Sequence, residues 1–450
     1  MNTIPNEGLI YYRSLLNVER IMPTTPQVLS EILTQKSYDF IKPPELSGGL
    51  GRILGVGILL AEGEEHKIQR KNLMPAFSFR HVKDLYPTFW SKSAHLVRNL
   101  MDEVGDRGSS SDDPTNSVEI SRWCSRATLD IIGIAGLGWN FNALDDPNNE
   151  LNAMYQKVLQ PTKVGQIMAF AGLIVPQKLL QAIPLAHNHN VKHAADGIRR
   201  IARDLITNKR KNMQDMEKPQ GKDILSVAIG SGYFSDENLV DQLMTFLAAG
   251  HETTATGLTW ALYLLCKDPE SQARLRKEVR SILPSPDSDE QMTVQLLESC
   301  TYLQAVCNEV LRLYAPVPMI VRVAARDTTL MGQFIPKGTP VMPPVWAINR
   351  SVKLWGPDAG EFNPERWMGS GKAGNGGAES NYALMTFIHG PRSCIGQAFA
   401  KAEFACLVAA LIGRFEFKLV DEIMKIQIKG GITARPRDGL NVKMKAVAGW

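Results

Sequence analysis

The sequence predicts a mainly helical protein with small β-sheets, an α+β fold. Apolar residues between about 64 and 310 recur mostly at intervals of three and four, which is the spacing of helices that bury one face. Residues 9–25 alternate loosely and carry β-branched and aromatic side chains, which is typical of a hairpin or a sheet margin. Polar breaks rich in glycine, serine and proline predict surface loops at 105–117, 284–290 and 369–381. Because composition does not change across these breaks, we expect a single domain over 1–450.

The composition excludes several classes of protein. The 450 residues are 44% hydrophobic and 21% charged with a net charge of +4, so the chain is globular and lacks the basic excess that binds nucleic acid. Its six cysteines form no C-x-x-C pair, which argues against zinc sites and disulfide frameworks. No uninterrupted apolar run reaches the roughly 18 residues that a membrane-spanning helix needs. The nearest, 168–186, is broken by two prolines, and it is interpreted as core or as a surface that touches a membrane or a lipophilic entrance.

One long helix is predicted from its end signals. Ser235 suits its N-cap, and Asp236 and Glu237 suit its positive end. Lys-Asp-Pro at 267–269 closes it, so the helix would be about 48 Å long at 1.5 Å per residue. Its centre, LAAGHETTATG, contains a glycine and three threonines, all of which weaken a helix interior. Such a centre is unusual for a purely structural helix.

Cys394 lies in FIHGPRSCIGQAFA, between two glycines and beside an arginine. A thiolate needs stabilising donors, and Gly390 and Gly396 would let backbone N–H groups approach the sulfur and admit a flat ligand. Arg392 would pair with carboxylates of that ligand, and Phe387 would pack against its apolar face. A lone cysteine in a turn is more often structural. The complete spacing F-x-x-G-x-R-x-C-x-G favours a ligand role instead.

With this motif the chain resembles the cytochrome P450 superfamily, the haem-thiolate monooxygenases, over essentially its whole length. The resemblance implies the P450 fold, in which a long central helix lies over haem b and a cysteine loop lies beneath it, with Cys394 as the proximal iron ligand. An anionic sulfur ligand favours O–O bond cleavage. The implied reaction inserts one oxygen atom of O2 into a lipophilic small molecule, as a hydroxylation or an epoxidation. Electrons would come from NADPH through NADPH–cytochrome P450 reductase.

A second motif carries the same resemblance. Glu309 and Arg312 in NEVLR lie three residues apart and share one helix face. In the family such a pair joins a third residue, here Arg366 of FNPERW, in a buried network beneath the haem-binding loop. This network is expected to be scaffold. Another E-x-x-R pair, Glu119 and Arg122, is not followed by such a segment and is interpreted as chance.

The resemblance also gives the centre of the long helix a role. Small Ala249 and Gly250 would leave room for dioxygen, and Glu252 and Thr253 match the acid and alcohol that deliver protons. The Thr253 hydroxyl is expected to bond to the Ala249 carbonyl and to open the helix locally. His251 matches no required position and is assigned no role.

Further haem contacts are implied for His66, Arg70 and Arg322. His66 and Arg70 are four residues apart on one helix face, where the family commonly has tryptophan and arginine, and Arg322 matches another contact to the haem carboxylates. Lys67 and Lys71 flank this face and are expected to steer an acidic redox partner. Surface ion pairs or solvated lysines are the alternative for these cations.

Three mostly apolar stretches are expected to contact a lipophilic substrate, with plain core as the alternative. Residues 47–57 resemble the flexible loop over the haem, and 316–320 resemble the edge of the pocket. Ile432 and Thr433 fall near a C-terminal turn that often touches ligand. The stretches LLAEGEEHKIQRK and GPRSC resemble fungal members that modify terpenoid, polyketide or alkaloid skeletons, so secondary metabolite biosynthesis is expected.

Two other functions remain open. A haem-thiolate isomerase or dehydratase would act on peroxides without external electrons, but Glu252 and Thr253 argue against it because such enzymes need no oxygen-activation relay. A non-catalytic haem-binding remnant is favoured by the short N-terminus, since the family's membrane anchor, proline-rich hinge and first helix are missing. The family is expected inside the cell at the cytosolic face of the endoplasmic reticulum. Without a transmembrane anchor, we expect peripheral membrane contact.

Overall fold

The computed structural model describes residues 4–14, 17–106, 117–159, 185–214, 223–423, 426–429 and 431–450, with single positions 164, 167, 168, 179 and 183. Most of the predicted loop 105–117 and most of the apolar stretch 168–186 lie outside the described residues. The chain divides into two compact units, which are described separately. Unit 1 contains 1–41, 82–127 and 252–450, and unit 2 contains 42–81 and 128–251.

Unit 1 carries the β-structure. Its five-stranded sheet has the order β1-β2-β8-β5-β3 and comprises β1 (Leu9–Arg13), β2 (Glu19–Pro23), β8 (Pro340–Val341), β5 (Arg322–Ala324) and β3 (Phe40–Ile41). Strands β1 and β2 pair antiparallel with Leu9 opposite Pro23, so the hairpin predicted for residues 9–25 is confirmed. The smaller sheets are β4 (Ser117–Glu119), β12 (Asn441–Ala446) and β9 (Phe415–Leu419); β6 (Thr328–Leu330) and β7 (Gln333–Ile335); and β10 (Ile428–Lys429) and β11 (Arg435–Pro436).

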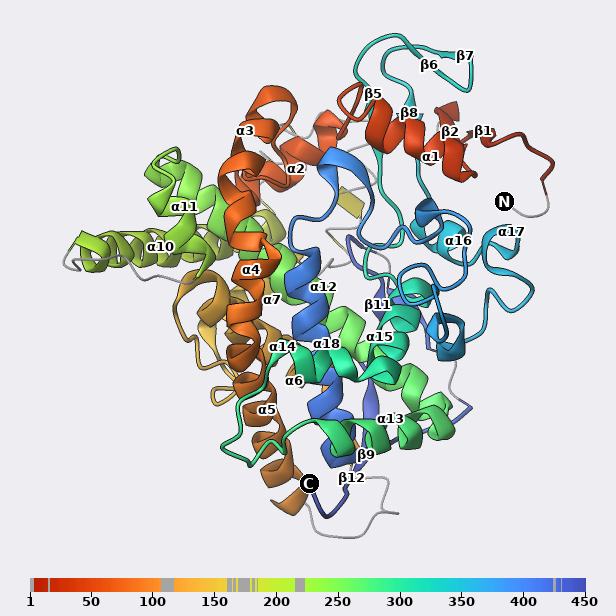
Figure 1. The fold of residues 1–450 in the computed structure, drawn as a ribbon. Coiled ribbons are helices and arrows are strands. Elements are labelled where there is room, and N and C mark those ends of the chain that lie inside the picture. The colour runs from red at the N-terminus through yellow and green to blue at the C-terminus, as the bar shows by residue number, and fades with distance from the viewer. Residues whose placement is uncertain are drawn as a thin grey trace. The chain divides into compact units, whose positions relative to one another are not determined.

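The helical core of unit 1 is built on α18 (Gln397–Arg414), which packs against α5 (Tyr86–Asp106), α13 (Pro269–Ile282) and α15 (Thr301–Leu313) (Figure 1). Helix α18 is apolar on nearly every side, as a helix buried in the core must be. The shorter helices of this unit are α1 (Pro26–Ser30), α14 (Val294–Ser299), α16 (Val345–Asn349), α17 (Val352–Trp355), the π-helix η2 (Glu31–Gln35), and the 3-10 helices η4 (Lys83–Leu85), η6 (Pro364–Trp367), η7 (Asn381–Ala383) and η8 (Gly390–Arg392).

Unit 2 is helical throughout its described part. It contains α2 (Pro44–Leu54), α3 (Gly63–Leu73), the 3-10 helix η3 (Met74–Phe77), the π-helix η5 (Ile132–Leu137), α7 (Glu150–Leu159), α10 (Ala186–Gln214) and α11 (Ile224–Gly230). Helix α10 packs against α7, α11 and α2. Three helices run from one unit into the other without a break: α4 (Phe79–Val82), α6 (Ile120–Ile131) and α12 (Asp236–Lys267). Within the described residues, no helix combines the length and the apolar character needed to cross a bilayer.

Helix α12 confirms the prediction of the long helix and of its ends. It spans Asp236–Lys267, and the Ser235 hydroxyl accepts a hydrogen bond from the Asn238 backbone N–H at 3.2 Å, which is an N-cap contact. The backbone stays helical through the glycine and the threonines at its centre. Together with the small sheets, this mainly helical architecture confirms the predicted fold class.

The expectation of a flexible loop at 47–57 is wrong for most of that segment. Helix α2 extends to Leu54, because prolines start it and its leucines recur at helical spacing. The following turn is fixed as well, since Val56 N–H donates to Asp241 Oδ2 at 2.8 Å and Ile58 N–H donates to Gln242 Oε1 at 2.9 Å. Gly55 has φ +72°, and a Cβ there would overlap the Asp241 carboxylate. These contacts within unit 2 leave this segment little freedom.

Candidate functional site

The turn that carries Cys394 is held by backbone hydrogen bonds. Cys394 N–H donates to the Phe387 carbonyl at 2.9 Å, and Ser393 N–H donates to the Gly390 carbonyl at 3.0 Å. Gly390 has φ +78°, and a Cβ at this position would overlap the carbonyl oxygen of Leu33 in η2, so glycine is required. Gly396 is the N-cap residue of α18 at φ −89°, a conformation open to any residue. The backbone conformation therefore does not require glycine at 396.

Cys394 differs from the other five cysteines because it alone is exposed. Burial raises the pKa of Cys266 and of Cys300 to about 12, so these thiols stay protonated. The described residues contain no group of three or more His, Cys, Asp or Glu side chains that could hold a metal ion. A haem iron bound to Cys394 would bring further ligands with it in its macrocycle.

Two buried arginines of unit 1 suit the carboxylates of such a cofactor. Arg392, which is 8% exposed, donates through Nη1 to the Phe40 carbonyl at 3.2 Å. Arg322, which is 7% exposed, lies on β5, the strand that pairs with β3 and therefore with Phe40. An exposed thiol on a fixed turn and two largely buried guanidinium groups in the same unit are a donor set that fits haem.

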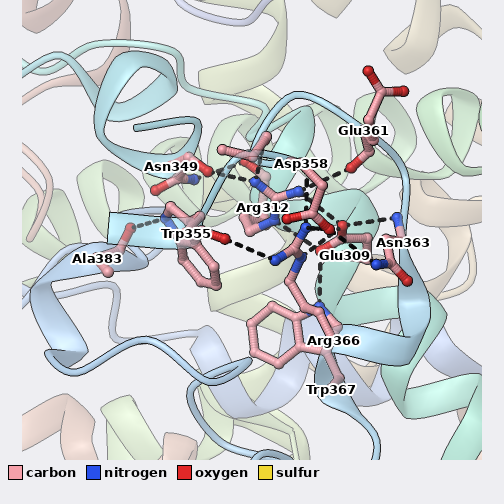
Figure 2. A network of polar contacts seen from close by, with 11 residues as sticks. Glu309, Arg312, Asn349, Trp355, Asp358, Glu361, Asn363, Arg366, Trp367 and Ala383 are labelled. Carbon is pink, nitrogen blue, oxygen red and sulfur yellow. Dashed lines mark hydrogen bonds and ion pairs between the residues drawn. The ribbon is translucent and has the colours of Figure 1, made fainter. Parts of the chain in front are cut away.

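Glu309 is the centre of a buried polar network in unit 1 (Figure 2). Its carboxylate binds Arg312 through two hydrogen bonds of 2.8 and 2.7 Å, and Arg366 Nε donates to it at 3.1 Å. Glu309 and Arg312 are both fully buried. The structure thus brings together the three residues named from the sequence, although 54 residues separate Arg312 from Arg366.

The network has two further members that the sequence argument missed, Asn363 and Trp367. The Asn363 backbone N–H and the Trp367 indole N–H donate to Glu309 at 2.9 Å each. Both residues stand in the quoted segment FNPERW, where an indole N–H one residue after the arginine was the available signal. Arg312 also donates to the carbonyls of Asn349 and Ala359 at 2.7 Å (Figure 2). The charged groups of Glu309 and Arg312 are therefore all hydrogen-bonded, as buried charges require.

Two other carboxylates show the range of environments in unit 1. Asp358 receives hydrogen bonds from Asn363 and Arg366, and these hold the pKa of its carboxyl below the ordinary value. The second E-x-x-R pair, Glu119 and Arg122, is an ion pair of 3.1 Å in which the arginine side chain is 84% exposed. Glu119 also accepts hydrogen bonds from the Ser121 and Leu440 backbone N–H groups, but its ion pair with the exposed Arg122 has little energetic weight.

Unit 2 carries the residues on α3 and α12 that were expected to contact haem or dioxygen. His66 is buried on α3, and Arg70 lies one helical turn further on and is partly buried. Lys67 on the same helix is exposed and forms an ion pair with Glu64. Ala249 and Gly250 lie in α12, where a Cβ on Gly250 would be 2.9 Å from the Ile132 side chain of η5. That side of Gly250 is packed, so room for dioxygen would have to lie on another side of the α12 backbone.

His251 has structural contacts within unit 2. Its ring meets the ring of Tyr155 edge to face at 5.8 Å between centroids, and its carbonyl accepts a hydrogen bond from the Thr128 hydroxyl at 3.0 Å. His251 is 2% exposed. These contacts agree with the absence of an assigned catalytic role.

Glu252 and Thr253 follow on α12 in unit 1, and both are partly buried. The Glu252 carboxylate accepts a hydrogen bond from the Thr433 hydroxyl at 2.7 Å, and Arg435 Nη1 lies 3.7 Å from the same oxygen. The turn of Thr433 is also bonded to the segment 316–320, because Ala434 N–H donates to the Pro316 carbonyl at 2.9 Å. The structure thus joins Glu252 with two of the stretches expected to contact substrate. The sequence argument missed Arg435.

Comparison with known proteins gives a family for this arrangement. The sequence matches the family model described as Cytochrome P450 over residues 7–444. It is 47% identical over 452 residues to cytochrome P450 monooxygenase sphH of Aspergillus fumigatus, covering 100% of this chain and 83% of that protein. It is 41% identical over 507 residues to cytochrome P450 monooxygenase ALT8 of Alternaria alternata, covering 100% and 84%. It is also 41% identical over 497 residues to cytochrome P450 monooxygenase FUM15 of Gibberella moniliformis, covering 100% and 83%. With its motifs, its fold class and these relatives in agreement, the chain belongs to the cytochrome P450 family and is an oxidoreductase of the monooxygenase type.

Proposed function

We propose that Cys394 is the proximal ligand of a haem b iron and that the chain inserts one oxygen atom of O2 into a lipophilic small molecule. The observation that carries this proposal is the exposed thiol of Cys394 on a turn fixed by Phe387 and Gly390, in a chain of the P450 family. Since α6 and α12 continue from one unit into the other, we further propose that residues 1–450 act as one catalytic domain.

Bound haem would supply oxygen binding and activation, and an anionic sulfur ligand favours O–O cleavage. The protein would position the haem and supply the charges that pair with the haem carboxylates. The hydrogen bond from the Cys394 N–H to the Phe387 carbonyl fixes the backbone of the turn from which the thiolate would project. Arg392 and Arg322 would bind the haem carboxylates from unit 1, and His66 and Arg70 would do so from unit 2. Phe387 would pack on the apolar face of the ring.

Proton delivery is proposed for Glu252 and Thr253. A carboxylate can take up a proton and pass it to a neighbouring hydroxyl, which is general acid catalysis through a relay and contributes roughly 10² to 10⁴ in rate. The Glu252 carboxylate suits this work because its two contacts, with Thr433 and Arg435, hold one of its oxygens. Glu309, Arg312 and Arg366 would not touch the reacting atoms, and their proposed role is to hold the segments around the cysteine turn.

The proposed electron donor is NADPH–cytochrome P450 reductase. The relatives with 41–47% identity are fungal monooxygenases, which supports a role in fungal secondary metabolism with a lipophilic substrate. Peripheral contact with the endoplasmic reticulum, on its cytosolic face, is proposed from the family expectation.

The test is the carbon monoxide spectrum of the reduced holoprotein. We expect the absorption band typical of thiolate-ligated haem in the wild type and its loss in Cys394→Ser. The matched control is Cys266→Ser, which removes a partly buried thiol outside the turn and should keep the band. A band typical of imidazole-ligated haem in folded wild-type protein, or an unchanged thiolate band in Cys394→Ser, would refute the assignment. If the thiolate band is present but products form from peroxides without NADPH, the isomerase or dehydratase alternative would replace the monooxygenase.

A further inference from the structure

The Glu252 carboxylate is held asymmetrically. The Thr433 hydroxyl donates to Oε1 at 2.7 Å, and Arg435 Nη1 lies 3.7 Å from the same Oε1. Oε2 takes part in neither contact. Glu252 is 15% exposed, and Thr433 is 6% exposed, so water competes little for the hydroxyl.

The turn that carries Thr433 and Arg435 is itself held by contacts within unit 1. Ala434 N–H donates to the Pro316 carbonyl at 2.9 Å, and the Ala434 carbonyl accepts a hydrogen bond from the Trp260 indole N–H at 2.8 Å. Trp260 lies eight residues after Glu252 on α12, about 12 Å along the helix axis. Strands β10 and β11 pair on either side of the turn, with Lys429 opposite Arg435. Contacts that do not involve Glu252 therefore also hold the turn of Thr433.

The two contacts differ in kind. At 2.7 Å the Thr433 contact is a short, directional hydrogen bond to a carboxylate, which is a strong class of hydrogen bond. At 3.7 Å the Arg435 contact is an ion pair without a direct hydrogen bond. An arginine that meets a carboxylate directly commonly binds both oxygens with its planar fork. The hydroxyl of Thr433 keeps Glu252 out of that bidentate arrangement, because it holds Oε1 in place.

We propose that Thr433 and Arg435 are positioning residues for Glu252, which hold the carboxylate by Oε1 and leave Oε2 to exchange protons. Thr433 sets the direction of the carboxylate, and Arg435 keeps it close to the turn. The proposal rests on the proposed role of Glu252 as proton donor. It adds that this role depends on a segment 181 residues away in the sequence.

The first experiment needs no catalytic activity. Amide hydrogen exchange of the peptide over 428–440 is measured by mass spectrometry on the holoenzyme, in wild type, Glu252→Gln, Thr433→Val and the double variant. We expect each single variant to speed up exchange of the turn about tenfold, because a hydrogen bond to a charged group is lost. The double variant should exchange no faster than the single variants, since the two changes remove the same contact. Arg437→Gln, an exposed arginine of the same hairpin, should leave the exchange unchanged.

The second experiment measures proton delivery through the fate of oxygen. With NADPH and the reductase but no substrate, the hydrogen peroxide released per NADPH is compared among the same variants. We expect Thr433→Val to raise this fraction about threefold, and Thr433→Ser, which keeps the hydroxyl, to restore the wild-type value. Replacing Arg435 alone by glutamine should also raise the fraction, because the Glu252 carboxylate then loses its ion pair.

The two experiments separate the two proposals. Unchanged exchange of the turn in both Glu252→Gln and Thr433→Val would refute the positioning role. So would a peroxide fraction in Thr433→Val equal to that of Thr433→Ser. An unchanged peroxide fraction in Glu252→Gln would instead refute the proton role of Glu252 itself, whatever the exchange of the turn shows.

Discussion

Glu403 on α18 is a fully buried carboxyl group, and neither of its oxygens has a hydrogen-bond partner in the structure. Burial raises the pKa of Glu403 well above its ordinary value of 4.5, and the nearby Thr254 hydroxyl offsets only part of this shift. The folded chain therefore keeps this proton at pH values where the unfolded chain has released it. The change from Glu403 to glutamine removes the titration and nearly preserves the shape.

The sign of the effect follows from which state binds the proton. Below the unfolded pKa both states are protonated and the carboxyl group carries no penalty. As the pH rises from there to the folded pKa, the unfolding free energy of the wild type falls by about 1.4 kcal/mol per pH unit. A chain of 450 residues has an unfolding entropy of about 0.9 kcal/mol/K, so this slope corresponds to about 1.5 °C in Tm per pH unit.

The assay is thermal unfolding of wild type and Glu403→Gln from pH 5 to pH 8 at constant ionic strength. We expect the Tm difference to grow in favour of Glu403→Gln by up to about 1.5 °C per pH unit, and to become constant above the folded pKa. The control for the substitution itself is Glu416→Gln on β9, whose side chain is 41% exposed. A Tm difference that does not change with pH would show that Glu403 is ionised in the folded protein, and the reasoning would be refuted.

Two other predictions concern the scaffold in unit 1. Glu309→Ala should lower the unfolding free energy by about 3–5 kcal/mol, because it leaves Arg312 buried without a carboxylate and Arg366 with Asp358 alone, whereas Arg122→Ala in the exposed pair should change it by less than about 0.5 kcal/mol. Urea denaturation measures both, and equal effects would contradict the distinction between the two E-x-x-R pairs. Gly390→Ala should weaken haem retention in gel filtration, since a Cβ there requires left-handed backbone and overlaps the Leu33 carbonyl. Gly360→Ala, which meets no atom within 4 Å, should retain haem like the wild type, and equal retention in both variants would count against a required glycine at 390.

The features that could be predicted from the sequence are those set by neighbours along the chain. The ends of α12 follow from a capping serine and a closing proline, and the hairpin at 9–25 follows from alternation of side chains. The segment 47–57 was expected to be a loop because it resembles the flexible loop over the haem, whereas Pro44 and the leucines that follow at helical spacing place most of it in a helix. Its following turn then depends on Asp241, which is 185 residues from Val56. Contacts between residues so far apart in the sequence cannot be predicted from the local spacing of residue types.

The site shows the same division between local pattern and distant contact. The motif spacing names Cys394, Glu309 and Glu252, because a turn or a helix face sets each of these positions locally. The partners Trp367 and Arg435 were missed, since their roles depend on where another part of the chain returns. The sequence alone does not show which acceptor an indole N–H or a guanidinium group reaches. Only the folded chain shows that these groups reach Glu309 and Glu252.

Three glutamates of unit 1 show how the surroundings of a carboxyl group determine what it can do. Glu309 accepts five hydrogen bonds spread over both oxygens, so its carboxylate is fixed in place. Glu403 accepts none and is stable only while it keeps a proton. Glu252 lies between these extremes, because one oxygen is held by Thr433 and Arg435 and the other takes part in neither contact. A group that must gain and lose a proton in every cycle needs this partial satisfaction, since full satisfaction would fix its charge and complete burial without partners would keep it neutral. The contrast therefore supports Glu252, and neither Glu309 nor Glu403, as the acid that moves protons.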